Sequence, residues 1–480
     1  KVAIYSTTLG YWHNTRELVN PGIGRQSISM AWDYAETNLF GGNADLKSAI
    51  SWVLKVINHC SEALSIRNTI IEVSQSSATS LSYPDNYFDA VITDPPYYYS
   101  VTYADLSDFF YVWLKRTIGD LYPELFATPL TPKAEEIIEG KFWDSIRYAE
   151  KDKEWFEKML TKAFNEIHRI LKPKGIVCIV FAHTSTEAWE TIINALLNSG
   201  LYLTASWPVH TEMNERLMAK QSAALASSIY MVCRKRTDSK TAYFNEVKSQ
   251  IESRIKEKLD QFWNEGIGGS DFFISAIGPA MEVFGKYESV EKLSGEKVSA
   301  KELLEFIRKS VSEYALTKIL KSPQLGAIDD EARFYLLWRW TYNSAKVHFD
   351  DARKLAQAVG IEITEQWGNG FIKKEKEYIS VLDAKERGRK FLEKEKFENM
   401  IDVLHACLLY WEKNNKKAIS EILETTGNLR NNSFWQVAQA ISEVLPDGDK
   451  EKQMLQGFLY GKEGYRKIEP KTETAQKELF

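Results

Sequence analysis

The chain has 480 residues, with 61 basic and 66 acidic side chains and a net charge of −5. This length predicts roughly two or three domains and a large apolar core. The charge balance excludes a global basic field, so any contact with nucleic acid must come from a local patch. No apolar run is long enough to cross a membrane, and no signal peptide or lipidation motif is present, so nothing suggests a membrane protein.

The four cysteines are too far apart in sequence for a C-x-x-C pair or a zinc ribbon: Cys60, Cys178, Cys233 and Cys407. Cys178 and Cys233 lie within apolar, strand-like runs, where a buried thiol is the expected role. We therefore expect no metal site, and a reducing, cytoplasmic compartment.

The N-terminal region offers a weak candidate for a cofactor pocket. The chain starts with Lys1 and runs directly into apolar residues, so we expect it to be a fragment of a longer protein. If residues 27–40 are helical, Asp33 and Glu36 lie close enough to share one face, as some acidic pairs in cofactor pockets do; solvated charges or a helix cap are the alternative. A clearer helix is predicted over 44–63, and Thr69–Val73 reads as a β-branched strand.

The most informative stretch is a short apolar run, Phe88–Ile92, followed by Asp94-Pro95-Pro96-Tyr97. Two consecutive prolines cannot donate ladder hydrogen bonds, so the predicted strand stops at Asp94. In open α/β sheets, the edge where such a strand ends is where ligands bind.

These four residues suit the methylation of an amino group on a nucleobase. Such a group is a poor nucleophile because its lone pair is delocalised into the ring. The Asp94 carboxylate and a carbonyl of the rigid Pro95-Pro96 backbone would accept its two N–H bonds and favour the reactive, pyramidal geometry. Tyr97 would supply a stacking face. A strand that simply ends in a proline turn is the alternative interpretation.

The segment after the motif is rich in aromatic residues. Tyr98, Tyr99 and Tyr103 are candidates to contact a flipped base or its neighbours. A helix is predicted from Tyr103, with Leu106, Phe110 and Trp113 as its buried stripe. Residues 120–150 read as an insertion, either a lid or a DNA-contacting loop.

The next segments alternate between helix and strand. A helix over Trp155–Leu171 is followed by a turn at Lys172–Gly175 and a strand at Ile176–Phe181, so His183 is expected at the same sheet edge as Asp94. Here a site role and a packing or capping role both remain open for His183. A further helix and two strands follow: Glu187–Ser199, Leu201–Val209 and Ser227–Cys233. This order predicts a doubly wound α/β sheet whose last two strands form a hairpin.

The composition changes near residue 237, which predicts a domain at 1–236 and a mainly α-helical domain at 237–480. The second domain shows helical periodicity, with one strand pair near Phe371–Ile372 and Tyr378–Val381. It contains no catalytic constellation in sequence, so we expect it to serve binding or assembly.

Several segments resemble the C-terminal part of the large adenine-specific DNA methylases that carry an upstream domain of unknown function and a zinc ribbon and are encoded in restriction and phage-defence loci. These segments are Gly24-Arg25-Gln26 with Met30–Glu36, Asp94–Tyr98 continuing through Tyr103–Phe110, Gly278-Pro279-Ala280, Arg333–Trp340, and Phe434-Trp435 with Ala438-Gln439-Ala440. The family's glycine-rich cofactor loop and zinc-ribbon cysteines have no match in residues 1–93.

The resemblance implies a partial class I (Rossmann-like) methyltransferase sheet that uses S-adenosylmethionine to methylate N6 of adenine in DNA. It assigns Asp94, Pro95, Pro96 and Tyr97 to the grip on the amino group; an aspartate in the first position favours adenine over the N4 position of cytosine. DNA and, in a defence system, ATPase, helicase or nuclease subunits are the implied partners. Two alternatives remain open: methylation of a protein or RNA amino group, and a non-catalytic DNA-binding scaffold.

Overall fold

A computed structural model describes residues 11–13, 18–20, 40, 45–65, 71–98, 101–141, 143–183, 185–210, 227–236, 240–322, 325–367, 370–394 and 396–465. Within these residues the fold is mixed α/β, rich in helix and with a small mixed sheet. The chain forms two compact units, residues 1–82 with 96–160 and residues 83–95 with 161–480. The domain boundary expected near residue 237 lies inside the second unit, so that division remains a prediction.

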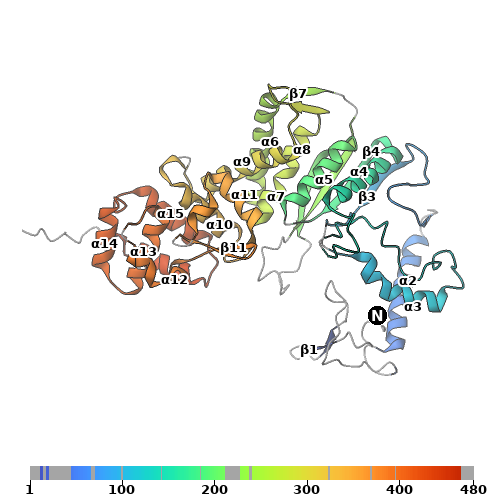
Figure 1. Cartoon of the computed structure of the whole chain (residues 1–480), viewed down its shortest axis with the longest axis horizontal. Helices are drawn as coiled ribbons and strands as arrows, with labels where there is room; N and C mark the ends of the chain where they lie inside the picture. The colour runs from blue at the N-terminus through green and yellow to red at the C-terminus, as the bar shows by residue number, and fades with distance from the viewer. Residues whose placement is uncertain are drawn as a thin grey trace, which may run out of the picture. The chain divides into compact units, whose positions relative to one another are not determined.

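The described part of the first unit contains two short strands, the helices α2 and α3, and the first residues of α4 (Figure 1). Strands β1 (Tyr11–His13) and β2 (Leu18–Asn20) pair in an antiparallel hairpin. Helix α2 (Leu46–Ser65) confirms the helix predicted at 44–63. Helix α3 (Tyr103–Ile118) confirms the helix predicted from Tyr103.

Two sequence predictions in this unit were wrong. Residues 71–73 form no strand, because none of the described residues pairs with them; residues 69–70 lie outside the described part. In α3, Trp113 is 52% exposed and Phe110 is also exposed, so the expected stripe is not buried as a whole. Helical spacing identified one apolar face but could not show whether another element covers it.

A four-stranded sheet in the second unit has the order β3-β4-β6-β5. Its strands are β3 (Phe88–Thr93), β4 (Leu171–Phe181), β5 (Leu201–His210) and β6 (Ser227–Lys235). β3 and β4 are parallel, whereas β6 is antiparallel to both β4 and β5. The predicted C-terminal hairpin is therefore confirmed, and its second strand lies between β4 and β5.

Residues Lys172–Gly175, predicted as a turn, instead belong to β4. They are accommodated as an irregularity, because the pairing steps from Phe88 with Leu171 to Ala90 with Ile176. Extra residues on one strand bend it locally, and this bend lets β4 contain a proline and a glycine.

One face of this sheet is buried and the other is partly exposed. Val177, Ile179 and Cys233 are buried on the first face. Helix α5 (Thr186–Asn198) lies beside it, and its Trp189 ring meets Phe181 edge-on, with ring centroids 5.0 Å apart. On the opposite face Ile92 is 79% exposed. Helix α4 (Lys153–Ile170) supplies the connection between β3 and β4, as predicted.

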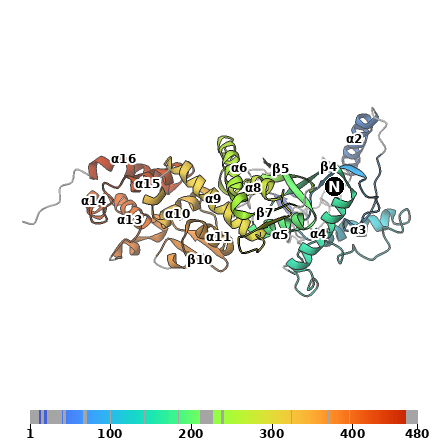
Figure 2. The ribbon, with the colours of Figure 1, turned by 90° about the horizontal axis from the view of Figure 1, so that it is seen from above.

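The rest of the second unit is mainly helical, as predicted. Its helices are α6 (Phe244–Asn264), α7 (Gly269–Ser275), α8 (Ile277–Phe284), α9 (Ala300–Leu320), α10 (Asp330–Thr341), α11 (Phe349–Val359), α12 (Ala384–Arg387), α13 (Met400–Glu412), α14 (Lys416–Thr425), α15 (Asn432–Val444), α16 (Lys450–Tyr460) and α17 (Lys462–Tyr465). Figure 2 shows α13, α14, α15 and α16 gathered together, and α16 packs against both α13 and α15.

Short strands decorate this helical part. Strands β10 (Ile372–Glu375) and β11 (Tyr378–Val381) confirm the predicted pair, and β9 (Val347–His348) extends it. A parallel pair, β7 (Thr241–Tyr243) with β8 (Ser289–Glu291), was not predicted. None of the helices in the described part is both long and apolar enough to cross a membrane.

Candidate active site

The structure places Asp94 at the carboxyl end of a parallel strand pair. β3 ends at Thr93, and Asp94 follows as an exposed residue. Thr93 pairs with Ile179 of β4, so Asp94 lies level with Val180 near the end of that strand. Both strands point toward this edge, the usual place for ligands in sheets of this kind. The arrangement leaves the carboxylate available to accept hydrogen bonds from a ligand.

His183 follows β4 at the same edge, three residues beyond the level of Asp94. The side chain is only 8% exposed. Its Nδ1 accepts a hydrogen bond from the Ser185 amide (3.0 Å), and its carbonyl oxygen accepts one from the Trp189 indole (2.9 Å). Burial lowers the pKa of His183 to about 4. The ring is therefore neutral near pH 7 and carries its proton on Nε2, which makes it a donor without charge.

Acidification is expected to destabilise the protein through His183. The unfolded chain takes up a proton near the ordinary pKa of 6.5, whereas the folded chain resists protonation down to about 4. Stability is consequently lost as pH falls through this window, by about 3 kcal/mol. Urea unfolding at pH 7 and pH 4 should show a smaller loss for His183→Asn, whose amide oxygen can still accept from Ser185. Equal losses in both proteins would contradict this role.

The second half of the motif, Pro96-Tyr97, belongs to the first unit. The Tyr98 amide donates to the Pro96 carbonyl (3.0 Å), which closes a three-residue turn around Tyr97. Tyr98 has a left-handed backbone, with φ of 56°. Its ring is 4% exposed and packs edge-on against Phe156 of α4, with centroids 5.3 Å apart. Tyr97 is half-buried.

The other candidate residues are placed unevenly. Tyr103 is the first residue of α3, and its ring is exposed. Tyr99 and the proposed cofactor residues Asp33 and Glu36 lie outside the described residues. Their expected roles remain predictions.

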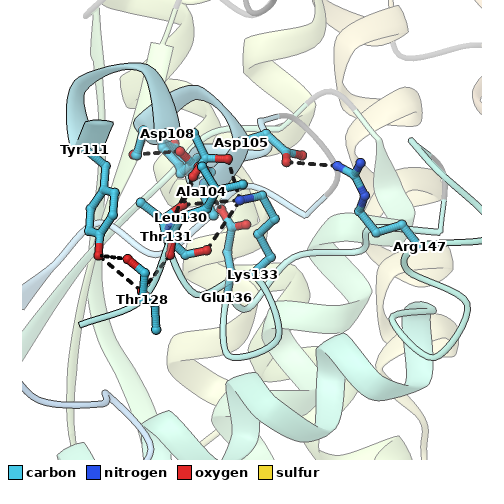
Figure 3. Close-up of polar contacts among 12 residues, drawn as sticks. Ala104, Asp105, Asp108, Tyr111, Thr128, Leu130, Thr131, Lys133, Glu136 and Arg147 are labelled. Atoms are coloured by element: carbon cyan, nitrogen blue, oxygen red, sulfur yellow. Dashed lines mark hydrogen bonds and ion pairs between the residues drawn. The ribbon is translucent and has the colours of Figure 1, made fainter. Parts of the chain in front are cut away.

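A polar cluster on α3, seen in Figure 3, was not anticipated as a unit. Asp108 accepts hydrogen bonds from the Thr131 amide (2.9 Å) and hydroxyl (2.6 Å) through one oxygen, and from Lys133 (2.6 Å) through the other. Burial alone would raise the pKa of Asp108, but the bonds from Lys133 and Thr131 together lower it. Tyr111 adds a bond from its hydroxyl to the Thr128 carbonyl (2.7 Å). Residues 128–133 are therefore fastened along α3.

The first turn of α3 carries a second set of contacts. Glu136 accepts a hydrogen bond from the Ala104 amide (3.0 Å), which satisfies an N–H group that the helix leaves unpaired. Burial raises the pKa of Glu136. Asp105 accepts from the Tyr148 hydroxyl (2.9 Å) and pairs with Arg147 (3.3 Å). Burial, followed by the bond to Asp105, raises the pKa of Tyr148 to about 12.

Sequence reasoning had singled out the parts of this cluster but not their connection. Asp105 and Asp108 lie among the aromatic residues after the motif, and residues 120–150 are predicted as a lid or a DNA-contacting loop. The available signal was the spacing of these two carboxylates, which places both on one face of a helix. That face meets the basic and acidic residues that follow the prolines of the insertion.

A buried charged network lies in the helical part of the second unit. Glu451 of α16 is 2% exposed; it accepts hydrogen bonds from the Tyr335 hydroxyl (2.5 Å) and from Arg339, both on α10. Burial alone would raise the pKa of Glu451, but Arg339, His405 and Tyr335 together outweigh it and lower that pKa. His405 of α13 lies 3.5 Å from the same carboxylate, and burial lowers its pKa.

The network continues through Arg387, which lies 3.2 Å from the His405 ring nitrogen and pairs with Asp402 (2.7 Å). Lys394 binds the other oxygen of Asp402 (2.9 Å). Buried charges are costly unless they are paired, so these contacts tie α10, α12, α13 and α16 together. Their residues come from three distant stretches of the chain, 335–339, 387–405 and 451, which periodicity cannot reveal.

A groove of about 890 Å³ lies between α6 and α9. Its lining includes Asp260, whose carboxylate accepts from Tyr314 (2.5 Å) and Lys318 (2.7 Å). Three acidic and three basic side chains line it: Glu252, Asp260, Glu313, Lys256, Lys318 and Arg333. This balance favours no particular ligand charge.

Among the described residues, no group of three or more histidine, cysteine, aspartate or glutamate side chains is placed to hold a metal ion. Comparison of the chain with protein-family models, with curated proteins and with solved structures found no match.

Proposed function

We propose that this protein is a DNA adenine-N6 methyltransferase that uses S-adenosylmethionine. The observation that carries the proposal is the position of Asp94, exposed at the carboxyl end of β3 and followed directly by Pro95-Pro96-Tyr97. This is where the resemblance to adenine-specific DNA methylases requires the motif to be.

The proposed reaction is direct transfer of the sulfonium methyl group to the adenine amino group. Asp94 and a proline carbonyl would accept the two amino N–H bonds and so favour a nitrogen whose lone pair points at the methyl carbon. The base would be extruded from the duplex and stacked on Tyr97. N6 would form its bond to the methyl carbon as the carbon–sulfur bond breaks with its electron pair remaining on sulfur, and the excess proton on nitrogen would then pass to solvent. Orientation supplies much of the rate.

The sheet supports a class I methyltransferase fold. In the second half of such a sheet, two parallel strands are followed by an antiparallel hairpin. The second strand of the hairpin lies between the parallel pair and the first strand of the hairpin. The order β3-β4-β6-β5, with β6 antiparallel to both neighbours, has this arrangement. His183 lies at the same edge as a neutral donor, suited to a polar contact with a base or with the cofactor.

The wider proposal follows from the same resemblance. DNA is the proposed substrate, ATPase, helicase or nuclease subunits of a restriction or phage-defence system are proposed partners, and the compartment is cytoplasmic. The helical region after residue 237 would serve DNA binding or assembly.

Incubation of the full-length protein with methyl-labelled S-adenosylmethionine and each acceptor class tests this function. The label is expected in DNA, and nucleoside analysis should identify N6-methyladenine. Label in protein or RNA instead would redirect the proposal to the other acceptors, and no labelled product with any of the three would contradict it.

One observation favours the non-catalytic alternative. β3 is the outer strand of the described sheet, and its Ile92 side chain is exposed. A scaffold subunit would bind DNA in a salt-dependent way but show no thermal shift with S-adenosylmethionine. A shift that saturates with cofactor concentration would exclude this alternative.

A further inference from the structure

The backbone at Tyr98 is held in a conformation that an aromatic residue rarely adopts. Its φ of 56° lies in the left-handed region, which residues other than glycine and asparagine rarely adopt. Such a residue persists only where its surroundings hold it. Its amide closes the turn around Tyr97, so whatever holds Tyr98 also determines how Tyr97 is presented.

The residues that hold Tyr98 come from the 120–150 insertion and from α4. The Glu139 amide donates to the Tyr98 carbonyl (3.3 Å), and the Tyr98 ring is buried against Phe156. The neighbouring Ile138 is 1% exposed, so this part of the insertion is packed rather than loosely attached. Tyr98 is thus held both at its carbonyl oxygen and at its side chain.

Lys151 connects the end of the segment 133–151, which contains Glu139, to its beginning. Its ammonium donates to the carbonyl oxygens of Lys133 and Glu136, each at 2.5 Å, and lies 4.7 Å from the centre of the Trp155 ring. The Lys151 side chain is buried. The backbone carbonyl oxygen of Lys151 accepts a hydrogen bond from the Lys141 amide (3.2 Å). A buried ammonium bonded to two carbonyls closes residues 133–151 into a loop.

This loop is also fastened to α3. Glu136 bonds the Ala104 amide, and Tyr148 bonds Asp105. Both contacts lie in the first turn of α3, only a few residues after Tyr98. The loop therefore contacts both Tyr98 and the first turn of α3.

We propose that residues 133–151 form a clamp that fixes the backbone of Tyr98 and so positions Tyr97 against the target base, with Lys151 as its central positioning residue. The positioning part rests on the proposed function, because it assigns Tyr97 to base stacking. The clamp itself concerns the order of the backbone, so it can be tested without any methyl transfer.

Hydrogen exchange of the full-length protein, read by mass spectrometry, tests the clamp. Lys151→Met keeps the aliphatic stem but loses both bonds to carbonyls, so exchange at the Tyr98 and Glu139 amides is expected to accelerate at least about tenfold. Lys151→Arg retains two donors and should restore protection. Lys158→Met, an exposed lysine on α4, serves as the matched control and should match the wild type. Tyr148→Phe removes one hydroxyl contact and should act in the same direction but less strongly, which provides a milder variant if Lys151→Met unfolds.

Steady-state kinetics test the positioning role. Lys151→Met is expected to raise KM for DNA about tenfold, the size of one lost stacking contact, with KM for S-adenosylmethionine unchanged and rescue by Lys151→Arg. Unchanged exchange at Tyr98 in Lys151→Met would overturn the clamp. Accelerated exchange with wild-type DNA kinetics would overturn its role in positioning Tyr97. If the wild type transfers no methyl group, the proposed function fails, while the exchange experiment still decides whether the clamp exists.

Discussion

Replacing Asp94 by alanine is expected to lower the rate of methyl transfer to DNA by roughly 10³-fold. The carboxylate follows β3 directly and is exposed at the sheet edge, where it would accept the amino hydrogen of adenine. Its loss removes an acceptor aimed at the reacting nitrogen, so kcat should fall far more than the affinity for S-adenosylmethionine. Asp94→Asn keeps one neutral acceptor and should lose less. Single-turnover transfer of a labelled methyl group measures both variants.

Asp89→Ala is the matched control for Asp94→Ala. Asp89 is an exposed carboxylate on the same strand, and it pairs with Lys172 at the surface (2.8 Å). Its replacement should leave transfer within about twofold of the wild type, because surface pairs contribute little. Full activity in Asp94→Ala, or an equal loss in the two variants, would contradict the assignment of Asp94 to the reaction.

Replacing Glu451 by alanine is expected to destabilise the second unit by about 3–5 kcal/mol. This carboxylate is buried and bonded by Tyr335 and Arg339. Without it, Asp449, 3.9 Å away, is the one acidic side chain among the described residues that still pairs with the buried Arg339 guanidinium. Equilibrium unfolding in urea, followed by circular dichroism, measures the change in the free energy of unfolding.

Glu443→Ala provides the comparison, because Glu443 pairs with Lys321 at the surface of the same helical region. Its loss should cost no more than about 1 kcal/mol. The double variant Arg339→Met with Glu451→Met removes both charges and should be less destabilised than Glu451→Ala. Equal effects of Glu451→Ala and Glu443→Ala would contradict the structural importance of the buried network.

Local signals in the sequence were sufficient for most individual elements. The end of β3 at Thr93 followed from Asp94 and two prolines, because these residues terminate a strand by covalent geometry and lost donors. Most of the longer helices after residue 237 followed from apolar spacing, because helices such as α6 and α14 bury one stripe of residues. Such signals depend on residues within a few positions of one another.

Pairing and coverage could not be predicted in the same way. Ile71 and Val73 have high strand propensity, yet no described strand pairs with them. Lys172–Gly175 looked like a turn, but β3 pairs with β4 on both sides of this segment, through Leu171 and Ile176. Whether Trp113 is covered depends on segments far away in sequence.

The candidate site shows the same division. Asp94 and His183 were placed at one sheet edge from strand ends alone, and the structure shows both following the parallel strands β3 and β4. The contacts of Tyr98 with Glu139 and Phe156 join residues about 40 to 60 positions apart, and no local pattern indicates them. Long-range contacts of this kind decide how a motif is presented, while the motif's residues indicate its chemistry.

The most direct test of the central claim is the adenine content of DNA from cells that make the full-length protein, compared with cells that make its Asp94→Ala variant. Nucleoside analysis is expected to show N6-methyladenine above background only with the wild type, confined to a fixed sequence context when the DNA is read at single-base resolution. Equal N6-methyladenine in both samples, or none in either despite folded protein and bound S-adenosylmethionine, would contradict DNA adenine methylation by this motif.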